Sequence, residues 1–216
     1  MKIQNKTNYS FQARNKTIRF ADDIARHVNI CYPRASSSRV DDFVNIQCFR
    51  KLKSKLNETT EFMREDISDA FGETENVVGR LLSFIKPIKK YRIGNCGESA
   101  QLSSIVAKIN GIKNCYIASL KTSCGKNLDH SVLFVNDEKP YIIDSWLGFA
   151  DFVQNAITRY KSEYRHHYDF EDEDKLVFKK LENDYTEFLN QDFKKTHINK
   201  IKRIYPQLLK KRGYVE

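Results

Sequence analysis

Hydrophobic residues recur at helical spacing through the first ninety residues of the chain. Apolar positions three or four residues apart share one face of a helix and so indicate amphipathic helices. We predict three such runs, which end before Pro33, at Gly72 and at Pro87. The second run is expected to begin near Arg39 and to break at residues 57–59.

The period changes in the centre of the chain. Apolar residues at helical spacing follow Cys96, and Gly111 ends that helix. Three short β-rich runs come next, at residues 112–120, 131–135 and 141–144. A loop of hairpin length joins the last two runs, so we expect them to pair as antiparallel strands.

Beyond Gly148 the apolar spacing is again helical. We predict three helices, at residues 149–160, 177–189 and 198–208, and Pro206 is expected to kink or cut the last one. The whole pattern indicates an α+β fold. In it a central helix packs on a small antiparallel sheet and is flanked by N- and C-terminal helices.

Length and composition favour one domain with a sizeable core, because 40% of the 216 residues are hydrophobic. We divide this single domain, residues 1–216, into a helical part (17–90), a core (91–148) and a second helical part (149–216). No apolar run is long enough to span a bilayer. Five cysteines without a CxxC pair, and a polar N-terminus, favour a reducing, cytoplasmic location.

Positive charge gathers at the C-terminal end. The net charge is +9, and residues 194–212 hold eight lysines and arginines but no acid. Such an end can attract nucleic acid, anionic lipid or an acidic protein, and it can equally be the solvated face of a helix. We expect this helix to contact an acidic partner or an anionic membrane, and we expect no specific nucleic acid.

Three residues of the core form a candidate catalytic set. Cys96 stands at a helix start, His130 opens one β-rich run, and Asp144 closes the next. A helix N-terminus and a neighbouring imidazole both favour the thiolate form of a cysteine, which is the nucleophilic form. A carboxylate that accepts from the imidazole fixes its tautomer. The pattern therefore predicts a cysteine nucleophile, a histidine base and an aspartate that orients the base.

The Cys96 backbone and three neighbours of this set have expected supporting roles. The backbone N–H of Cys96 would point towards a developing oxyanion, and Asn95 is a candidate second donor. Gly97, next to the cysteine, lets backbone and substrate approach closely. Trp146, the only tryptophan, would cover the His130–Asp144 hydrogen bond.

Other constellations predict no metal and no cofactor. His166 and His167 are adjacent, so they point different ways, and we interpret them as surface residues. Cys115 and Cys124 lack the two further ligands that zinc requires. The glycines around Cys96 are not followed by the Lys-Ser/Thr pair of a phosphate-binding loop.

The core also resembles a known superfamily. GNCGESA is similar to the nucleophile segment of papain-like cysteine peptidases, LDHSVLFV to their histidine strand, and Asp144-Ser145-Trp146 to their Asn-Ser-Trp. Only thirty-four residues separate Cys96 from His130, far fewer than in true papain-type enzymes. This compact order is similar to the transglutaminase-like core, to arylamine N-acetyltransferases and to glutamine-deamidating bacterial effectors. About 60 of the 216 residues carry the resemblance.

The resemblance implies a papain-like or transglutaminase-like core and acyl transfer through a Cys96 thioester. It implies a protein substrate, such as a host protein, and a deamidase, peptidase or transglutaminase activity. It also implies an effector that reaches a host cell without a classical signal peptide. The alternative is a non-catalytic binding module of the same fold, in which the basic C-terminal helices contact an acidic partner or an anionic membrane.

Overall fold

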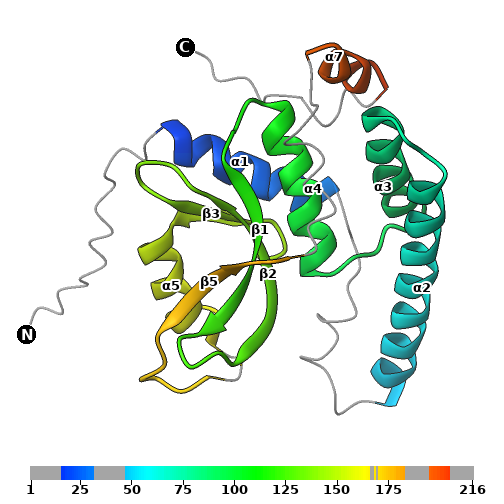
Figure 1. Cartoon of the computed structure of the whole chain (residues 1–216). Helices are drawn as coiled ribbons and strands as arrows, with labels where there is room; N and C mark the ends of the chain where they lie inside the picture. The colour runs from blue at the N-terminus through cyan, green and yellow to red at the C-terminus, as the bar shows by residue number, and fades with distance from the viewer. Residues whose placement is uncertain (1–15, 32–46, 166–167, 169, 183–194, 205–216) are drawn as a thin grey trace, which may run out of the picture.

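The computed structural model describes residues 16–31, 47–165, 168, 170–182 and 195–204 (Figure 1). This part of the chain is α+β, as the sequence predicts. The helices are α1 (Lys16–Cys31), α2 (Gln47–Gly72), α3 (Val77–Tyr91), α4 (Cys96–Ile109), α5 (Val153–Ser162) and α7 (Lys195–Ile204). The strands are β1 (Cys115–Thr122), β2 (Asn127–Val135), β3 (Tyr141–Asp144), β4 (Phe149–Phe152) and β5 (Leu176–Lys180). They form one antiparallel sheet in the order β4-β3-β2-β1-β5.

Both faces of the sheet are buried. Helices α1 and α4 cover one face, and α2 and α3 stand beside α4, away from the sheet (Figure 1). Helix α5 covers the other face together with Phe170. Ile143 of β3 belongs to the first core and Ile142 to the second, as the alternation of side chains along a strand requires. Asp144 therefore shares the α5 face with Ile142.

Two predicted helix breaks do not occur. Helix α2 continues through residues 57–59, where no glycine or proline stands. There the hydroxyl of Thr59 donates to the carbonyl oxygen of Lys55, which satisfies it within the helix. Pro87 lies inside α3, which runs on to Tyr91. A proline costs about 3 kcal/mol in a helix interior, and burial of the apolar residues around it offsets that cost, at about 1.5–3 kcal/mol for each large side chain.

Two predicted helices of the C-terminal part need correction: the one at 149–160 is confirmed only from Val153 onwards, and the one at 177–189 begins as a strand. Residues 149–152 form strand β4, and α5 begins only at Val153. The run from Val177 begins in β5, which pairs with β1, a strand 54 to 62 residues earlier in the chain. Val177 and Leu181 match helical spacing, but pairing with a distant strand overrides that local pattern. The part from residue 149 onwards is thus mixed and not all-helical.

Helix α7 confirms part of the last predicted helix. Ile201 is fully buried and belongs to the core, and α7 contacts α3. Among the described helices, none combines the length and the apolar character that a membrane span requires. Several expectations lie outside the described residues: the helix start at Arg39, the helix end before Pro33, the kink at Pro206, and the pair His166 and His167.

Gly148 ends the turn that joins β3 to β4, and it adopts a left-handed backbone with φ of 79°. An added Cβ would meet the Asn29 side chain at 3.4 Å. We predict that Gly148→Ala lowers the free energy of unfolding by about 1–2 kcal/mol, the usual cost of a non-glycine residue in that conformation. Urea unfolding measures the difference. Gly72→Ala is the matched control, because a Cβ there has nothing within 4 Å; equal stability of the two variants would contradict the prediction.

Candidate active site

Cys96 is the first residue of α4, and a capping box fixes that helix start. The Glu98 carboxylate accepts from the backbone N–H of Asn95 at 2.8 Å, and the Asn95 side chain accepts in return from the backbone of Glu98. The other Glu98 oxygen accepts from Nε of Arg64 in α2 at 2.9 Å. Glu98 is buried, so the position of Cys96 depends on a contact between two helices.

The helix start also supplies hydrogen-bond donors. The first N–H groups of an α-helix have no acceptor within the helix, and those of Cys96 and Gly97 are the first two of α4. A Cβ added to Gly97 would have nothing within 4 Å, so the space beside the cysteine is open. Asn95 serves as the N-cap of the helix. The two backbone N–H groups can therefore stabilise negative charge that develops next to the Cys96 sulfur.

A β-bulge places His130 against the cysteine. On β2, His130 pairs with Leu120 of β1, but the next pair joins Asn127 to Lys121, so two residues of β2 have no partner. One of them, Asp129, has a φ of 48°, a left-handed conformation that is uncommon outside glycine. Its carbonyl oxygen accepts from Sγ of Cys96 at 3.7 Å. Bulge and helix start thus meet beside the sulfur.

His130 and Asp144 form a buried pair. Nε2 of His130 donates to Oδ2 of Asp144 at 2.6 Å, and the two residues expose 2% and 0% of their surfaces. Leu133 pairs with Ile143 in the β2–β3 register, which puts Asp144 opposite Val132. Asp144 is therefore on the same face as His130 and diagonal to it. The hairpin expected from the sequence does bring these two residues together.

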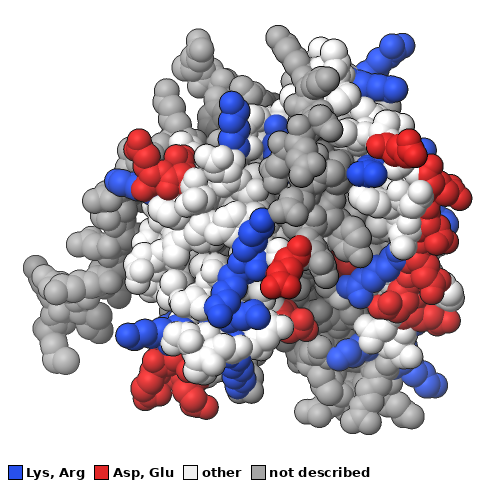
Figure 2. All heavy atoms as spheres, viewed as in Figure 1, with Lys and Arg blue, Asp and Glu red and all other residues white. Residues whose placement is uncertain are grey.

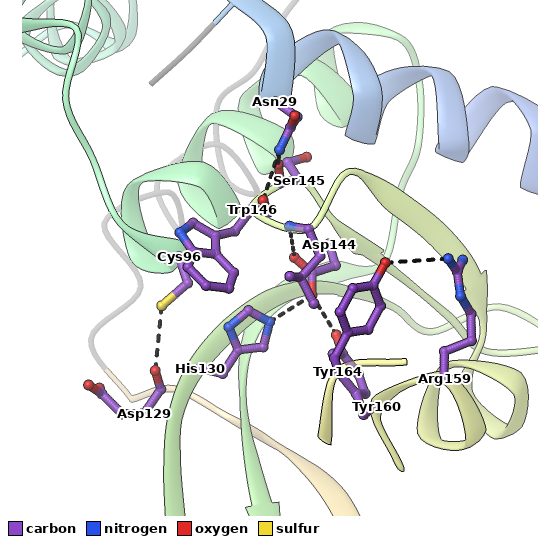
Figure 3. A network of polar contacts seen from close by, with 11 residues as sticks. Asn29, Cys96, Asp129, His130, Asp144, Ser145, Trp146, Arg159, Tyr160 and Tyr164 are labelled. Atoms are coloured by element: carbon purple, nitrogen blue, oxygen red, sulfur yellow. Dashed lines mark hydrogen bonds and ion pairs between the residues drawn. The ribbon is translucent and has the colours of Figure 1, made fainter. Parts of the chain in front are cut away.

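Asp144 accepts three hydrogen bonds in all. Besides the imidazole, the hydroxyl of Tyr160 in α5 donates to Oδ2 at 2.7 Å, and the backbone N–H of Leu147 donates to Oδ1 at 3.0 Å (Figure 3). Burial alone would raise the pKa of Asp144, but the charge of His130 and these three donors outweigh burial and lower the pKa. Asp144 is thus held as a carboxylate.

The same pair determines the charge of His130. Burial alone would lower the pKa of His130, but the charge of Asp144, their hydrogen bond and contact with the Cys96 side chain raise it to about 10. The Asp144 bond occupies Nε2, so Nδ1 is the nitrogen left for Cys96 (Figure 3). At neutral pH the imidazole is therefore a cation between a carboxylate and a thiol.

Aromatic rings enclose the imidazole. The ring centroids of Trp146, Tyr160 and Tyr168 lie 5.6, 5.7 and 5.2 Å from that of His130. Trp146 is 7% exposed, and its ring packs edge-on against that of His130. These rings keep water from the His130–Asp144 hydrogen bond, which strengthens it because the local dielectric is low.

Helix α1 holds the turn that follows Asp144. The Asn29 side-chain amide donates to the carbonyl oxygens of Ser145 and Trp146 at 2.9 and 2.8 Å (Figure 3). The hydroxyl of Ser145 is hydrogen-bonded to that of Ser103 in α4. The turn is thereby tied both to α1 and to the helix that carries the cysteine.

The structure therefore brings together Cys96, His130, Asp144 and Trp146, with Asn95 and Gly97 at the same helix start. Sequence reasoning missed five residues that position them. The spacing Asn95-x-x-Glu98 is itself a capping-box signal and could have identified Glu98. No local signal marks the other four, Asn29, Arg64, Asp129 and Tyr160. Within the described ranges, no three His, Cys, Asp or Glu side chains are grouped so that they could hold a metal ion.

Asp144→Asn tests whether the negative charge of Asp144 raises the pKa of His130, because the substitution removes that charge and keeps the size of the side chain. We predict that the pKa of His130 falls below its ordinary value of 6.5, since burial then dominates. Nitrogen-15 NMR of the ring nitrogens between about pH 5 and pH 10 measures that pKa. Asp137→Asn, in the exposed loop of the same hairpin, is the control. An imidazole still charged at about pH 8 in Asp144→Asn would refute the argument.

Comparison with known proteins finds no family model, no curated protein and no solved structure that matches this chain. The chemistry of the site must therefore be inferred from its own residues. They amount to a half-exposed thiol, a charged imidazole and a buried carboxylate, in contact in that order.

Proposed function

We propose that the protein is a cysteine hydrolase or acyltransferase in which Cys96 attacks the carbonyl carbon of an amide. The observation that carries the proposal is the sequence of contacts from Asp144 through His130 to Cys96. A structural histidine needs neither a buried carboxylate on one nitrogen nor a thiol on the other. Nucleophile, base and orienting group in this arrangement are what thiol catalysis requires.

The reaction follows from the positions of these groups. In the reactive form the Cys96 proton is already on Nδ1 of the charged His130, and the Cys96 thiolate attacks the carbonyl carbon. The backbone N–H groups of Cys96 and Gly97 stabilise the oxyanion. When the tetrahedral intermediate collapses, the C–N bond breaks and the leaving amine takes the proton from His130. The resulting thioester is attacked by water or by a second amine, and His130 accepts the proton of that nucleophile. The C–S bond then breaks, which releases the acyl product and restores the Cys96 thiolate beside the charged His130.

A papain-like or transglutaminase-like core is the finer fold that we propose. Helix α4 packs on β1, β2 and β3, and the nucleophile, base and acid follow in the chain order of those enzymes. By that likeness the substrate is a protein, and the activity is glutamine deamidation, peptide hydrolysis or transglutamination. An effector acting within a host cell fits the same likeness.

A binding role for α7 is the second candidate, and the charge of this helix favours it. Ile201 is buried, whereas Lys200 and Arg203 are exposed on the outer side. Basic side chains lie at the outer end of this helix, and acidic ones line the edge formed by α2 (Figure 2). An acidic partner or an anionic membrane matches the α7 surface. This role is compatible with catalysis at Cys96, and it can also exist without it.

Alkylation by iodoacetamide at about pH 6 separates a catalytic thiol from an inert one. We predict that Cys96 reacts about 100-fold faster in the wild type than in His130→Ala, the lower end of the usual range for a positioned base. We also predict that p-nitrophenyl acetate gives a burst of one equivalent and an acetyl group on Cys96. Cys96→Ala should abolish the burst and remain folded. Peptide mass spectrometry locates both modifications.

Cys124 is the internal control for this measurement. It is an exposed thiol, and its hydrogen bond with Thr122 lowers its pKa. Its rate should not change in His130→Ala. If Cys96 reacts no faster than Cys124 and forms no acetyl thioester, the catalytic proposal fails and the binding module remains.

Charge reversal tests the α7 surface. We predict that Lys200→Glu with Arg203→Glu weakens binding to vesicles rich in anionic lipid or to an acidic protein, and more so at low salt. Each basic residue near an anionic membrane contributes about 1 kcal/mol, and salt screens it. Vesicle sedimentation measures binding, and alkylation of Cys96 should be unchanged. Equal binding by both proteins at low salt would leave α7 as a solvated helix face only.

A further inference from the structure

Tyr160 contacts the acidic end of the site from a separate element. It lies near the end of α5, is fully buried, and donates from its hydroxyl to Oδ2 of Asp144 at 2.7 Å. The same oxygen accepts from Nε2 of His130 at 2.6 Å. In Figure 3 the phenol and the imidazole approach the carboxylate from two sides. The other oxygen, Oδ1, accepts from the backbone N–H of Leu147.

We propose that Tyr160 is a positioning residue, the fourth member of the set formed by Cys96, His130 and Asp144. It keeps Asp144 ionised and turned towards the imidazole, and it touches neither the thiol nor the substrate. This inference rests on the proposed function, because Tyr160 acts on the thiol only through Asp144 and His130. The two ideas nevertheless make separate predictions.

Hydrogen-bond direction explains how Tyr160 acts on Asp144. An ionised carboxylate can only accept, whereas a protonated one carries an O–H that must itself find an acceptor. A phenol, an imidazole and a backbone amide all donate to Asp144, so all three select its charged form. Two donors on one oxygen and one on the other also fix the rotation of the carboxylate. Loss of the phenol would relax both constraints.

The Tyr160 phenol donates to Asp144 as a neutral group. Burial, together with the charge of Asp144, raises the pKa of Tyr160 well above its ordinary value, so the hydroxyl stays protonated. It stabilises the carboxylate without adding positive charge. A lysine or arginine in this place would repel the imidazolium and lower the pKa of His130. A neutral donor leaves the full negative charge of Asp144 to hold the proton on His130.

Tyr160→Phe tests the role of the hydroxyl, because the ring is kept. We expect the pKa of Asp144, followed by carbon-13 NMR of its carboxyl carbon, to rise by about one pH unit, the size typical of a hydrogen bond to a charged group. At low pH the rate of Cys96 alkylation falls, and the pH range of this fall (the acid limb of the pH profile) should shift to higher pH by a similar amount. The reason is that a protonated Asp144 no longer holds His130 as a cation. The rate should fall about tenfold on that limb and little at about pH 8.

Tyr141→Phe is the matched control. Tyr141 is 2% exposed and lies on the same strand as Asp144, but it belongs to the core on the other face of the sheet. Loss of its hydroxyl should leave both the pKa of Asp144 and the acid limb unchanged. If Tyr160→Phe and Tyr141→Phe both match the wild type, the Tyr160 hydroxyl has no positioning role and the inference is overturned.

Site-specific incorporation of 3-fluorotyrosine at position 160 gives a second measurement. It keeps the hydroxyl, and it decides the inference even if Tyr160→Phe does not fold. Fluorine makes the phenol a stronger donor, so the pKa of Asp144 and the acid limb should both move downward. An unchanged pKa would overturn the inference. The carboxyl measurement does not need catalysis. If wild-type alkylation proves independent of His130, the proposed function fails, while the response of Asp144 to Tyr160 still decides this inference.

Discussion

The buried pair of His130 and Asp144 is the interaction on which the rest of the site depends. Removal of two charges from water costs several kcal/mol for each ion, and the attraction offsets that cost only when every donor and acceptor is matched. Here the carboxylate accepts from an imidazole, a phenol and a backbone amide. These donors come from β2, from α5 and from the turn after β3, so the pair requires that all three elements be assembled. It therefore links the site to the formation of the whole sheet.

Cys96, unlike the buried pair, is partly exposed at the start of helix α4. The helix that carries it packs on the sheet face opposite to that of His130 and Asp144. The bulge at Asp129 is where the two sides meet, because its carbonyl oxygen contacts the Cys96 sulfur. The buried pair is shielded by aromatic rings, whereas the nucleophile has open space beside Gly97. This division matches the needs of thiol chemistry, in which the base must be dry and the sulfur accessible.

The sequence was informative wherever position is determined locally. Cys96 could be placed at a helix start, and His130 and Asp144 on one hairpin, because turns and strand periods lie next to those residues. Asn29 could not be found, since it lies 116 residues from Ser145 in the chain. Tyr160 is only 16 residues from Asp144, but no local signal marks which side chain of α5 faces the carboxylate. Strand β5 was missed for the same reason: its few apolar residues match helical spacing, and only pairing with β1 makes them a strand. In α3, tertiary packing outweighed the usual effect of Pro87.

The β2–β3 register has a consequence for how this site can vary in evolution. The pairing of Leu133 with Ile143 puts Asp144 opposite Val132. His130 is two residues before Val132 on the same strand, so its side chain and that of Asp144 lie on the same face of the sheet. One residue inserted within either strand would turn one partner to the opposite side of the sheet and separate the pair. Residues added to the exposed loop 136–140 would leave that parity intact. Related sites are therefore expected to differ freely in loop length, while their strands keep the same odd-even relation between histidine and acid.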